Sequence, residues 1–356
     1  MGSECVETAE RAGSAGVNNA GIAARVSAVG WKKERVVTRL GYQIPNFTYP
    51  GVAPDGLFDA VRRQAIEADR SGFDTVAVMD HFYQLAGLGT PDMEMVECYT
   101  LLSALSQHTS WVRLSALVTG NTYRNPTLLA KTITALDIVS GGRAQLGIGA
   151  GWFEFEHDSL GYEFGTFTDR FERLEESLQI ILPMLRGERA TLNGKWYTVR
   201  EAMNSPAPLS RIPVMIGGGG ERKTLRMVAQ YADESNLIAR PDDIPRKLDA
   251  LAGHCERLGR DRSEITVTLQ LSACIGATHD EATADGDAYF AVRGDQIAAA
   301  RRANMLIGTG DEIAEQCAKL LTTGIDGFTI NMPANGHIEG RVTMLGEALA
   351  PLIRPT

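Results

Sequence analysis

Short runs of β-branched and apolar residues alternate along the chain with longer segments in which apolar residues recur every three or four positions. The short runs are typical of buried parallel strands, and the longer segments are typical of amphipathic helices. The expected strands are Val37–Ile44, Thr75–Met79, Arg113–Thr119, Ala144–Gly149, Val214–Ile216, Asn236–Ile238, Thr266–Cys274 and Gly327–Asn331. The expected helices are Asp55–Ser71, Pro126–Val139, Asp169–Leu185, Arg222–Tyr231, Asp243–Leu258, Asp311–Thr323 and Ile338–Ile353. Eight βα units predict a closed (β/α)8 TIM barrel, and an open doubly wound sheet is the alternative.

Three segments exceed the usual connection length of about 2–6 residues. Trp152–Thr168 is rich in aromatic side chains, and Asp280–Ala303 has a helical pattern. Gly187–Arg211 contains Ala190–Thr198, whose pattern indicates a hairpin turning on Asn193 and Gly194. Long loops on a regular scaffold often bind ligands or cover a site.

Composition separates the first 35 residues from the rest. They are rich in Ala, Gly, Ser and Glu without a cationic and then apolar stretch, so we expect a disordered leader rather than a secretory signal. Residues 36–356 are expected to form a single barrel domain. The net charge of -9 argues against a nucleic-acid partner, and no apolar run is long enough to span a membrane.

Cysteine usage favours a reducing compartment. The chain has five widely separated cysteines, Cys5, Cys98, Cys255, Cys274 and Cys317. This pattern indicates free thiols rather than a disulfide framework, and it supports no metal site. The expected setting is the cytoplasm.

Candidate chemistry follows the carboxyl ends of the strands, where (β/α)8 barrels place their active sites. Asp80 and His81 follow the second strand, and His exchanges protons near neutral pH. The alternative is a strand-end cap in which His81 only packs. Gly149, Ala150, Gly151 and Trp152 follow the fourth strand and permit close approach of a ligand, the alternative being a tight turn beside a core Trp.

A run of four glycines follows the fifth strand. Gly217, Gly218, Gly219 and Gly220 precede a helix that begins near Arg222. Main-chain amides and the positive end of a helix can bind a phosphate there. The alternative is an ordinary flexible turn.

Several of these segments together resemble the luciferase-like monooxygenase superfamily, and more narrowly its members that use coenzyme F-420, an 8-hydroxy-5-deazaflavin. The segments are Leu40–Ile44, Val78–Phe82, Val118–Asn121 with Arg124–Pro126, Leu136–Asp137, Ser140–Arg143, Gly147–Trp152 and Pro213–Gly218. The resemblance covers residues 37–352.

The resemblance implies a cofactor at the carboxyl ends of the strands. The ring would pack on a bulge of the third strand that contains a non-proline cis peptide, here near Ala116 and Leu117. Thr119 and Asn121 would contact the ring or its ribityl chain. The remaining expected cofactor contacts are Gly149, Ala150, Gly151 and Trp152 near the side chain, and Gly217, Gly218, Gly219, Gly220 and Arg222 at the phosphate.

The glucose-6-phosphate dehydrogenase branch implies proton transfer by an Asp-His pair, which Asp80 and His81 match. Trp152 and Leu85 stand where that branch has Glu and Trp, so the sugar-phosphate substrate does not carry over. Glu154 is the nearby candidate for an acid role.

The predicted activity is hydride transfer between coenzyme F-420 and an unidentified small organic molecule. One alternative is a monooxygenase that uses reduced FMN and a partner reductase. Another is a barrel that binds a phosphorylated ligand without turnover. A homodimer is possible.

Overall fold

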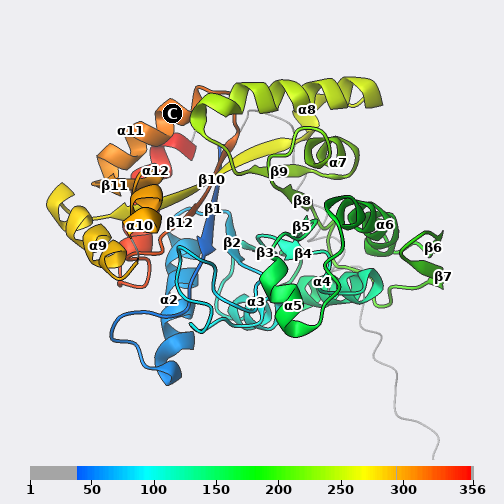
Figure 1. Cartoon of the computed structure of the whole chain (residues 1–356), viewed down its shortest axis with the longest axis horizontal. Coiled ribbons are helices and arrows are strands. Elements are labelled where there is room, and N and C mark those ends of the chain that lie inside the picture. Colours follow the sequence, from blue (N-terminus) through cyan, green and yellow to red (C-terminus); the bar gives the residue numbers. More distant parts are fainter. Residues whose placement is uncertain (1–37, 294, 354–356) are drawn as a thin grey trace, which may run out of the picture. The chain divides into compact units, whose positions relative to one another are not determined.

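The computed structural model describes residues 38–293 and 295–353, so the predicted leader lies outside the described residues. Eight parallel strands form a closed barrel (Figure 1). Their bounds are β1 (Arg39–Ile44), β2 (Thr75–Val78), β3 (Arg113–Ala116), β5 (Ala144–Gly149), β8 (Val214–Gly217), β9 (Glu234–Leu237), β10 (Thr266–Ile275) and β12 (Gly327–Asn331). Pairing of β10 with both β9 and β12 closes the ring. The predicted (β/α)8 barrel is confirmed, and the open sheet is excluded.

Helices pack around the barrel. They are α2 (Leu57–Arg70), α3 (Cys98–Ser106), α4 (Pro126–Ser140), α6 (Phe167–Leu185), α7 (Thr224–Tyr231), α8 (Ile244–Leu258), α11 (Gly310–Leu321) and α12 (Arg341–Ile353). Short 3-10 turns cover Pro54–Gly56, Pro241–Asp243 and Arg262–Glu264. The pattern analysis missed α3 because most of this helix is buried, which leaves little polar face to reveal a helical period.

Local sequence fixes several helix ends. Asn125 caps α4 by accepting a hydrogen bond from the N–H of Thr127, and Gly141 ends that helix in the left-handed conformation. Thr166 and Asp169 form a reciprocal capping box at the start of α6. These caps set where the preceding loops leave the barrel.

The predicted hairpin is confirmed as β6 (Ala190–Asn193) and β7 (Thr198–Ala202), but its turn was predicted wrongly. Asn193 pairs with Thr198, so the turn spans residues 194–197 rather than Asn193 and Gly194 alone. Glu176 of α6 accepts hydrogen bonds from the N–H groups of Lys195, Trp196 and Tyr197 at 2.7–2.9 Å. A tertiary contact therefore sets this turn.

The other two insertions are partly helical. α5 (Glu154–Leu160) lies in the aromatic loop after β5. The helical pattern after β10 forms α9 (His279–Ala291) and α10 (Asp295–Arg302), and then the unexpected strand β11 (Met305–Gly308). β11 pairs in parallel with the carboxyl end of β10, outside the barrel ring.

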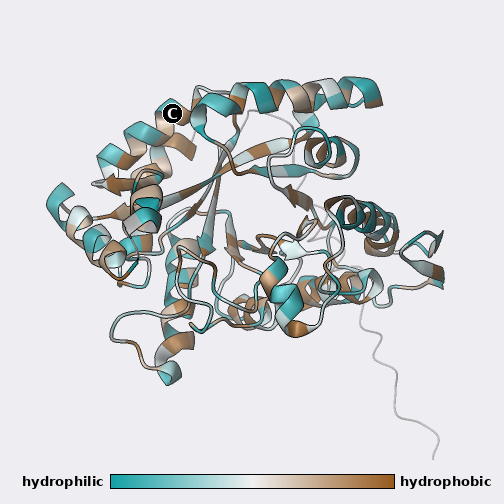
Figure 2. Ribbon diagram, viewed as in Figure 1, coloured by the Kyte–Doolittle hydropathy of each residue, from teal (hydrophilic) through white to brown (hydrophobic). Residues whose placement is uncertain are grey.

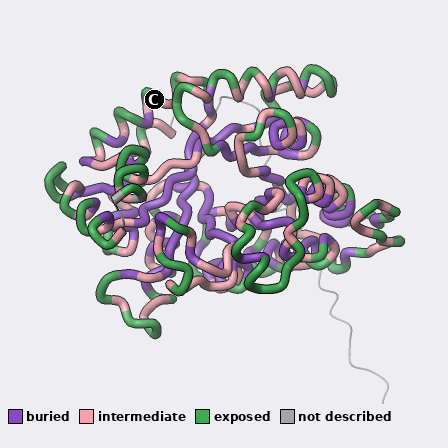
Figure 3. The backbone as a smooth tube through the Cα atoms, viewed as in Figure 1, coloured by how far each residue is buried: buried purple, intermediate pink, exposed green. Residues whose placement is uncertain are grey.

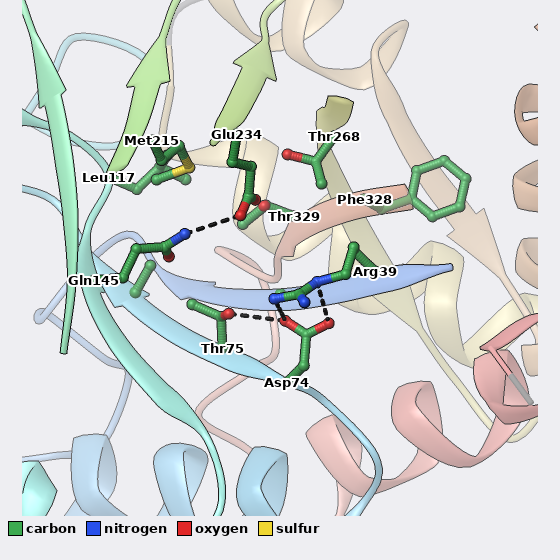
Figure 4. Close-up of a pocket in the computed structure, with 12 residues that line it drawn as sticks. Arg39, Asp74, Thr75, Leu117, Gln145, Met215, Glu234, Thr268, Phe328 and Thr329 are labelled. Atoms are coloured by element: carbon green, nitrogen blue, oxygen red, sulfur yellow. Dashed lines mark hydrogen bonds and ion pairs between the residues drawn. The ribbon is translucent and has the colours of Figure 1, made fainter. Parts of the chain in front are cut away.

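The apolar core lies between the strands and the helices. Figure 3 shows buried strands surrounded by helices with exposed outer sides, and Figure 2 shows the matching split between hydrophobic and hydrophilic positions. The barrel interior is more polar. At its amino-terminal end, the Nε of Arg39 lies 3.0 Å from Asp74 and the Nε2 of Gln145 donates to Glu234 at 2.8 Å (Figure 4).

Four of the predicted free thiols, Cys98, Cys255, Cys274 and Cys317, are buried and unpaired. Among the described helices, none has the length and apolarity to cross a bilayer.

Candidate functional site

The third barrel strand is broken at the carboxyl rim, by which we mean the carboxyl ends of the barrel strands and the loops that follow them. β3 ends at Ala116, the peptide bond between Leu117 and Val118 is cis, and the chain resumes as β4 (Thr119–Gly120), which pairs with β5. The cis bond predicted near Ala116 and Leu117 thus lies one residue later, and the predicted continuous strand is interrupted. Leu117 and Val118 are only partly buried.

Glycines on the neighbouring strands make room for this break. A Cβ on Gly147 would lie 2.0 Å from the carbonyl oxygen of Ala116. A Cβ on Gly149 or Gly217 would lie 2.9 or 2.8 Å from the side chain of Val118. Val118 therefore rests directly on the glycine backbone of β5 and β8. The sequence analysis assigned Gly149 and Gly217 to a cofactor but missed Val118.

His81 is held by a carboxylate that the sequence analysis missed. Its Nδ1 lies 2.9 Å from the Oε2 of Glu156, which is on α5. Glu156 is fully buried, and it also accepts hydrogen bonds from the N–H of Tyr83 at 2.7 Å, the N–H of Phe82 and the hydroxyl of Tyr123. Because Nδ1 is engaged, proton exchange with a ligand would use the Nε2 of His81.

The charge of Glu156 is set by two opposing effects. Burial opposes ionisation, but hydrogen bonds from His81 and Tyr123 outweigh burial and hold the pKa of this carboxyl below its usual value. The result is a buried carboxylate that fixes the orientation of the imidazole.

Asp80 points to a different partner. Its Oδ2 lies 2.5 Å from the Nη1 of Arg124, whose Nη2 lies 2.6 Å from Glu97. Burial raises the pKa of Asp80 despite the neighbouring guanidinium. The sequence-adjacent Asp80 and His81 therefore bind separate partners.

Aromatic side chains lie against His81. The rings of Trp152 and Phe153 are edge-on to the imidazole, at centroid distances of 5.8 and 5.7 Å. Trp152 is 63% exposed. Glu154, the predicted acid, is exposed on the first turn of α5, and the carboxylate that contacts His81 is Glu156 two residues later.

The segment after β4 presents one unsatisfied amide. Asn121 is 2% exposed, its N–H donates to the carbonyl of Gly149 at 3.0 Å, and its Nδ2 has no partner among the described residues. A buried donor of this kind is costly unless a ligand accepts from it. Thr119, by contrast, is hydrogen-bonded to the hydroxyl of Tyr99 on α3.

The loop from Gly149 to Gly151 is tied to α5. Gly151 has a φ of 83°, and a Cβ there would lie 2.7 Å from the hydroxyl of Thr122. That hydroxyl lies 2.6 Å from the Nε2 of His157, while Ala150 is partly buried. Glycine is therefore required by the turn as well as by any ligand.

The glycine run forms a tight loop at the amino end of α7. Gly218 has a φ of 113°, and its N–H donates to the carbonyl of Asn236 at 2.9 Å. A Cβ on Gly220 would lie 2.9 Å from the hydroxyl of Thr224, and one on Gly219 would lie 3.1 Å from the carbonyl of Ile238. These contacts, together with the positive φ of Gly218, restrict side chains in the loop.

Cations flank this loop. Arg222 is exposed, and the Nζ of Lys247 donates to the carbonyl of Gly219 at 2.6 Å. Lys223, the N-cap of α7, forms no side-chain cap. The uncapped amides and the nearby positive charges suit an anion. Lys247 was not foreseen, because it lies on a helix that follows the next strand.

The arrangement fits a flavin-like group with a phosphate tail. His81, Asn121 and the glycine run follow the carboxyl ends of β2, β4 and β8, so all three lie at the same rim of the parallel barrel. The unsatisfied amide of Asn121 and the tight glycine loop supply a donor and an anion cradle. Among the described residues, no group of three or more His, Cys, Asp or Glu side chains is placed to hold a metal ion.

Comparison with known proteins gives consistent results. The family model for luciferase-like monooxygenases matches residues 38–330. The chain is 27% identical over 250 residues to an F-420-dependent glucose-6-phosphate dehydrogenase of Microbacterium testaceum, covering 68% of this chain and 70% of the relative. It is 25% identical over 329 residues to an FMNH(2)-dependent dimethylsulfone monooxygenase of Pseudomonas putida, covering 83% and 88%.

Among solved structures, an F-420-dependent secondary alcohol dehydrogenase in complex with an F-420-acetone adduct superposes with a TM-score of 0.73 at 19% identity. The match covers 89% of this chain and 99% of that one, which supports the fold. Together with the family match over most of the barrel, the broken third strand and the glycine loop, this leads to one conclusion: the chain belongs to the luciferase-like monooxygenase family and is an oxidoreductase of that family.

Proposed function

We propose that this protein is a coenzyme F-420-dependent oxidoreductase that transfers a hydride between the deazaflavin and a small organic substrate. The observation that carries this proposal is the pairing of His81 with the buried Glu156 at the same rim as the glycine loop. Two of the similar proteins, the glucose-6-phosphate dehydrogenase and the secondary alcohol dehydrogenase, are F-420-dependent, and this supports the choice of cofactor.

Each part of the rim has a proposed task. Val118 and Leu117 would support the ring, and Asn121 would donate to it or to its ribityl chain. Gly149, Ala150, Gly151 and Trp152 would border the side chain. The phosphate would be bound by Gly217, Gly218, Gly219 and Gly220, with Arg222 and Lys247 adding charge. When bound, the reduced deazaflavin supplies a hydride.

His81 would supply or accept the accompanying proton through Nε2. General acid–base catalysis by a positioned side chain contributes about 10²- to 10⁴-fold. Glu156 would keep Nδ1 protonated and the ring fixed. Asp80 would act indirectly, by holding Arg124 and the end of β2.

A monooxygenase that uses reduced FMN is the second candidate, because an FMNH(2)-dependent dimethylsulfone monooxygenase is 25% identical over 83% of the chain. Such an enzyme would need a reductase partner to supply reduced FMN. The two proposals differ in cofactor and in oxygen use.

Calorimetric titration with F-420, FMN and FAD in parallel tests the choice. Binding of F-420 with at least about 10-fold preference over FMN, or about 1.4 kcal/mol, supports the first proposal. Tight binding of reduced FMN together with substrate-dependent oxygen consumption supports the second.

The role of His81 is tested by substitution. We expect His81→Ala to lose about 10²- to 10⁴-fold in kcat while retaining its affinity for the cofactor. His108→Ala is the control, because His108 is exposed beyond the end of α3. Unchanged turnover in His81→Ala would contradict the assignment. Cofactor binding without redox activity in both the wild-type protein and His81→Ala would favour a non-catalytic binding barrel.

A further inference from the structure

Two parts of the carboxyl rim, the glycine loop at one end and the surroundings of His81 at the other, differ in charge. At the glycine loop, Lys247 donates to a main-chain carbonyl, Arg222 is exposed, and the Nζ of Lys223 lies 5.1 Å from the ring centre of Phe167. At the other end, His81 faces the rings of Trp152 and Phe153. Cationic groups thus lie at the proposed cofactor tail, whereas the imidazole is bordered by two aromatic rings and by the buried carboxylate of Glu156.

Arg124, which lies between β4 and α4 and contacts Asp80 after β2, is already neutralised. Arg124 lies between Asp80 and Glu97, with N–O distances of 2.5 and 2.6 Å, and its guanidinium also packs over the ring of Tyr99. A substrate anion would have to compete with two carboxylates for this group.

A second cation, Arg170, is used in holding the aromatic loop. It donates to the carbonyl oxygens of Gly151 at 3.0 Å and Gly165 at 2.9 Å, and it packs over the ring of Phe164. Its donors therefore point into the loop's own backbone.

The α9–α10 insertion contributes two further cations near the β2 loop. Arg293 donates to the carbonyl of Leu88 and Arg301 to that of Ala86. No carboxylate accepts from either group among the described residues, so these two cations offer the competing subsite for an anionic substrate.

The aromatic cluster beside His81 is exposed to solvent. Trp152 stacks on Phe153 at a centroid distance of 5.2 Å, and Phe153 lies 6.0 Å from Phe155. Trp152 is 63% and Phe155 51% exposed. Single exposed apolar residues are common, but a contiguous exposed aromatic cluster beside a group that can exchange protons is typical of a ligand-binding surface.

We infer that the substrate is an uncharged carbonyl compound, or the corresponding alcohol, on an apolar or aromatic skeleton that packs on Trp152 and Phe153. The inference rests on the proposed function. In the reducing direction, the reduced deazaflavin gives a hydride to the carbonyl carbon and is oxidised. The C=O π bond breaks, a C–H bond forms, and the oxygen takes a proton from the Nε2 of His81 to give the alcohol.

A matched pair of ketones tests this inference. Acetophenone and 4-acetylbenzoate share a skeleton and differ by one carboxylate. Binding to the F-420-loaded protein is read by ligand-observed NMR, which does not require turnover, and kcat/KM is then measured with reduced F-420. We expect acetophenone to be preferred by at least about 10-fold, since the described cations Arg124 and Arg170 are already engaged by carboxylates or by main-chain carbonyls.

Substitutions of Trp152 assign the contact. Trp152→Ala should lower the affinity for acetophenone about 10-fold through the lost ring contact, measured at an F-420 concentration that calorimetry shows to saturate the variant. Trp152→Lys should reverse the preference in favour of 4-acetylbenzoate. Trp111→Ala is the control, because Trp111 is 67% exposed but lies just before β3, at the amino-terminal end of the barrel.

The outcomes separate the inference from the proposed function. Absence of F-420 binding would overturn the proposed function. Normal F-420 binding with equal or stronger binding of 4-acetylbenzoate, or with no binding of either ketone, would overturn the inference alone. A preference for 4-acetylbenzoate that is lost in Arg293→Ala or Arg301→Ala would assign the substrate anion to the insertion instead. Equal losses in Trp152→Ala and Trp111→Ala would also overturn it.

Discussion

At the residue scale, the proposed function depends on where the imidazole of His81 is held. Glu156 contacts His81 and accepts two main-chain N–H groups of the segment that carries it. One buried carboxylate therefore fixes both the loop after β2 and the tautomer of His81. A neutral amide in its place could keep its acceptor oxygen on the main-chain N–H groups, but its NH₂ would face the imidazole and Tyr123.

We therefore expect Glu156→Gln to lower kcat about 10- to 100-fold and to shift the acidic limb of the pH–rate profile. The same substitution should cost about 1–3 kcal/mol in the free energy of unfolding, because buried hydrogen-bonding groups lose their partners. Glu154→Gln is the matched control two residues away, and as an exposed substitution it should stay within about 0.5 kcal/mol of wild type.

Steady-state kinetics and urea unfolding of both variants decide the point. A lower kcat in Glu154→Gln, with an unchanged kcat in Glu156→Gln, would support the acid role expected of Glu154. It would contradict the role proposed for Glu156.

At the element scale, the candidate site lies where β3 is interrupted and where the glycines of β5 leave space for that interruption. The carbonyl of Ala116 turns toward β5, and the absence of a side chain on Gly147 lets it approach. A side chain at position 147 would prevent the interruption of β3 in this geometry. It would also prevent the contact between Val118 and Gly149. The glycine residues of β5 are thus structural requirements of the rim.

Gly147→Ala should destabilise the protein by about 2 kcal/mol or more, because its Cβ would lie 2.0 Å from a main-chain oxygen that cannot move away independently. Gly253→Ala is the control. It lies inside α8 with its nearest neighbour atom 3.6 Å from the added Cβ, so it should stabilise by about 0.5–1 kcal/mol. Chemical unfolding of both variants should give shifts of opposite sign; two shifts of the same sign would contradict this account of the break.

At the scale of the whole barrel, the two ends have different tasks. The carboxyl rim carries the exposed aromatic and glycine-rich segments. The amino-terminal end holds polar contacts, the ion pair of the partly buried Arg39 and Asp74 and the hydrogen bond from Gln145 to the buried Glu234 (Figure 4). Such a division between a functional and a stabilising end is expected of (β/α)8 barrels.

Burial raises the pKa of Glu234, and the nearby Arg39 only partly offsets it. Between the ordinary Glu value of about 4.3 and this raised value, the folded state binds more protons than the unfolded state. The free energy of unfolding should therefore fall as pH rises through that window. In Glu234→Gln, which can still accept from Gln145, this fall should be smaller.

Urea unfolding at several pH values between about 4 and 8 measures the difference between the two proteins. Glu339→Gln, at an exposed position before α12, should follow the wild-type curve. A Glu234→Gln curve parallel to wild type would show that this carboxyl does not titrate differently on folding.

The barrel could be predicted from the sequence alone, and so could the rim on which the candidate site residues lie. The alternation of strand and helix patterns is local, and parallel strands necessarily bring the residues after them to one edge, so His81 and Gly217–Gly220 could be assigned together. The hairpin was also predictable, because its alternating pattern is local.

Only the tertiary structure decided which side chains meet at that rim. Glu156 lies 75 residues from His81 in the chain, and the sequence offered no means of preferring it to Glu154. Asp80 adjoins His81 in sequence but binds Arg124, which follows β4. The turn of the hairpin likewise follows from Glu176 on a packed helix. Local patterns set which elements form, whereas partners across the fold depend on packing between elements distant in the chain.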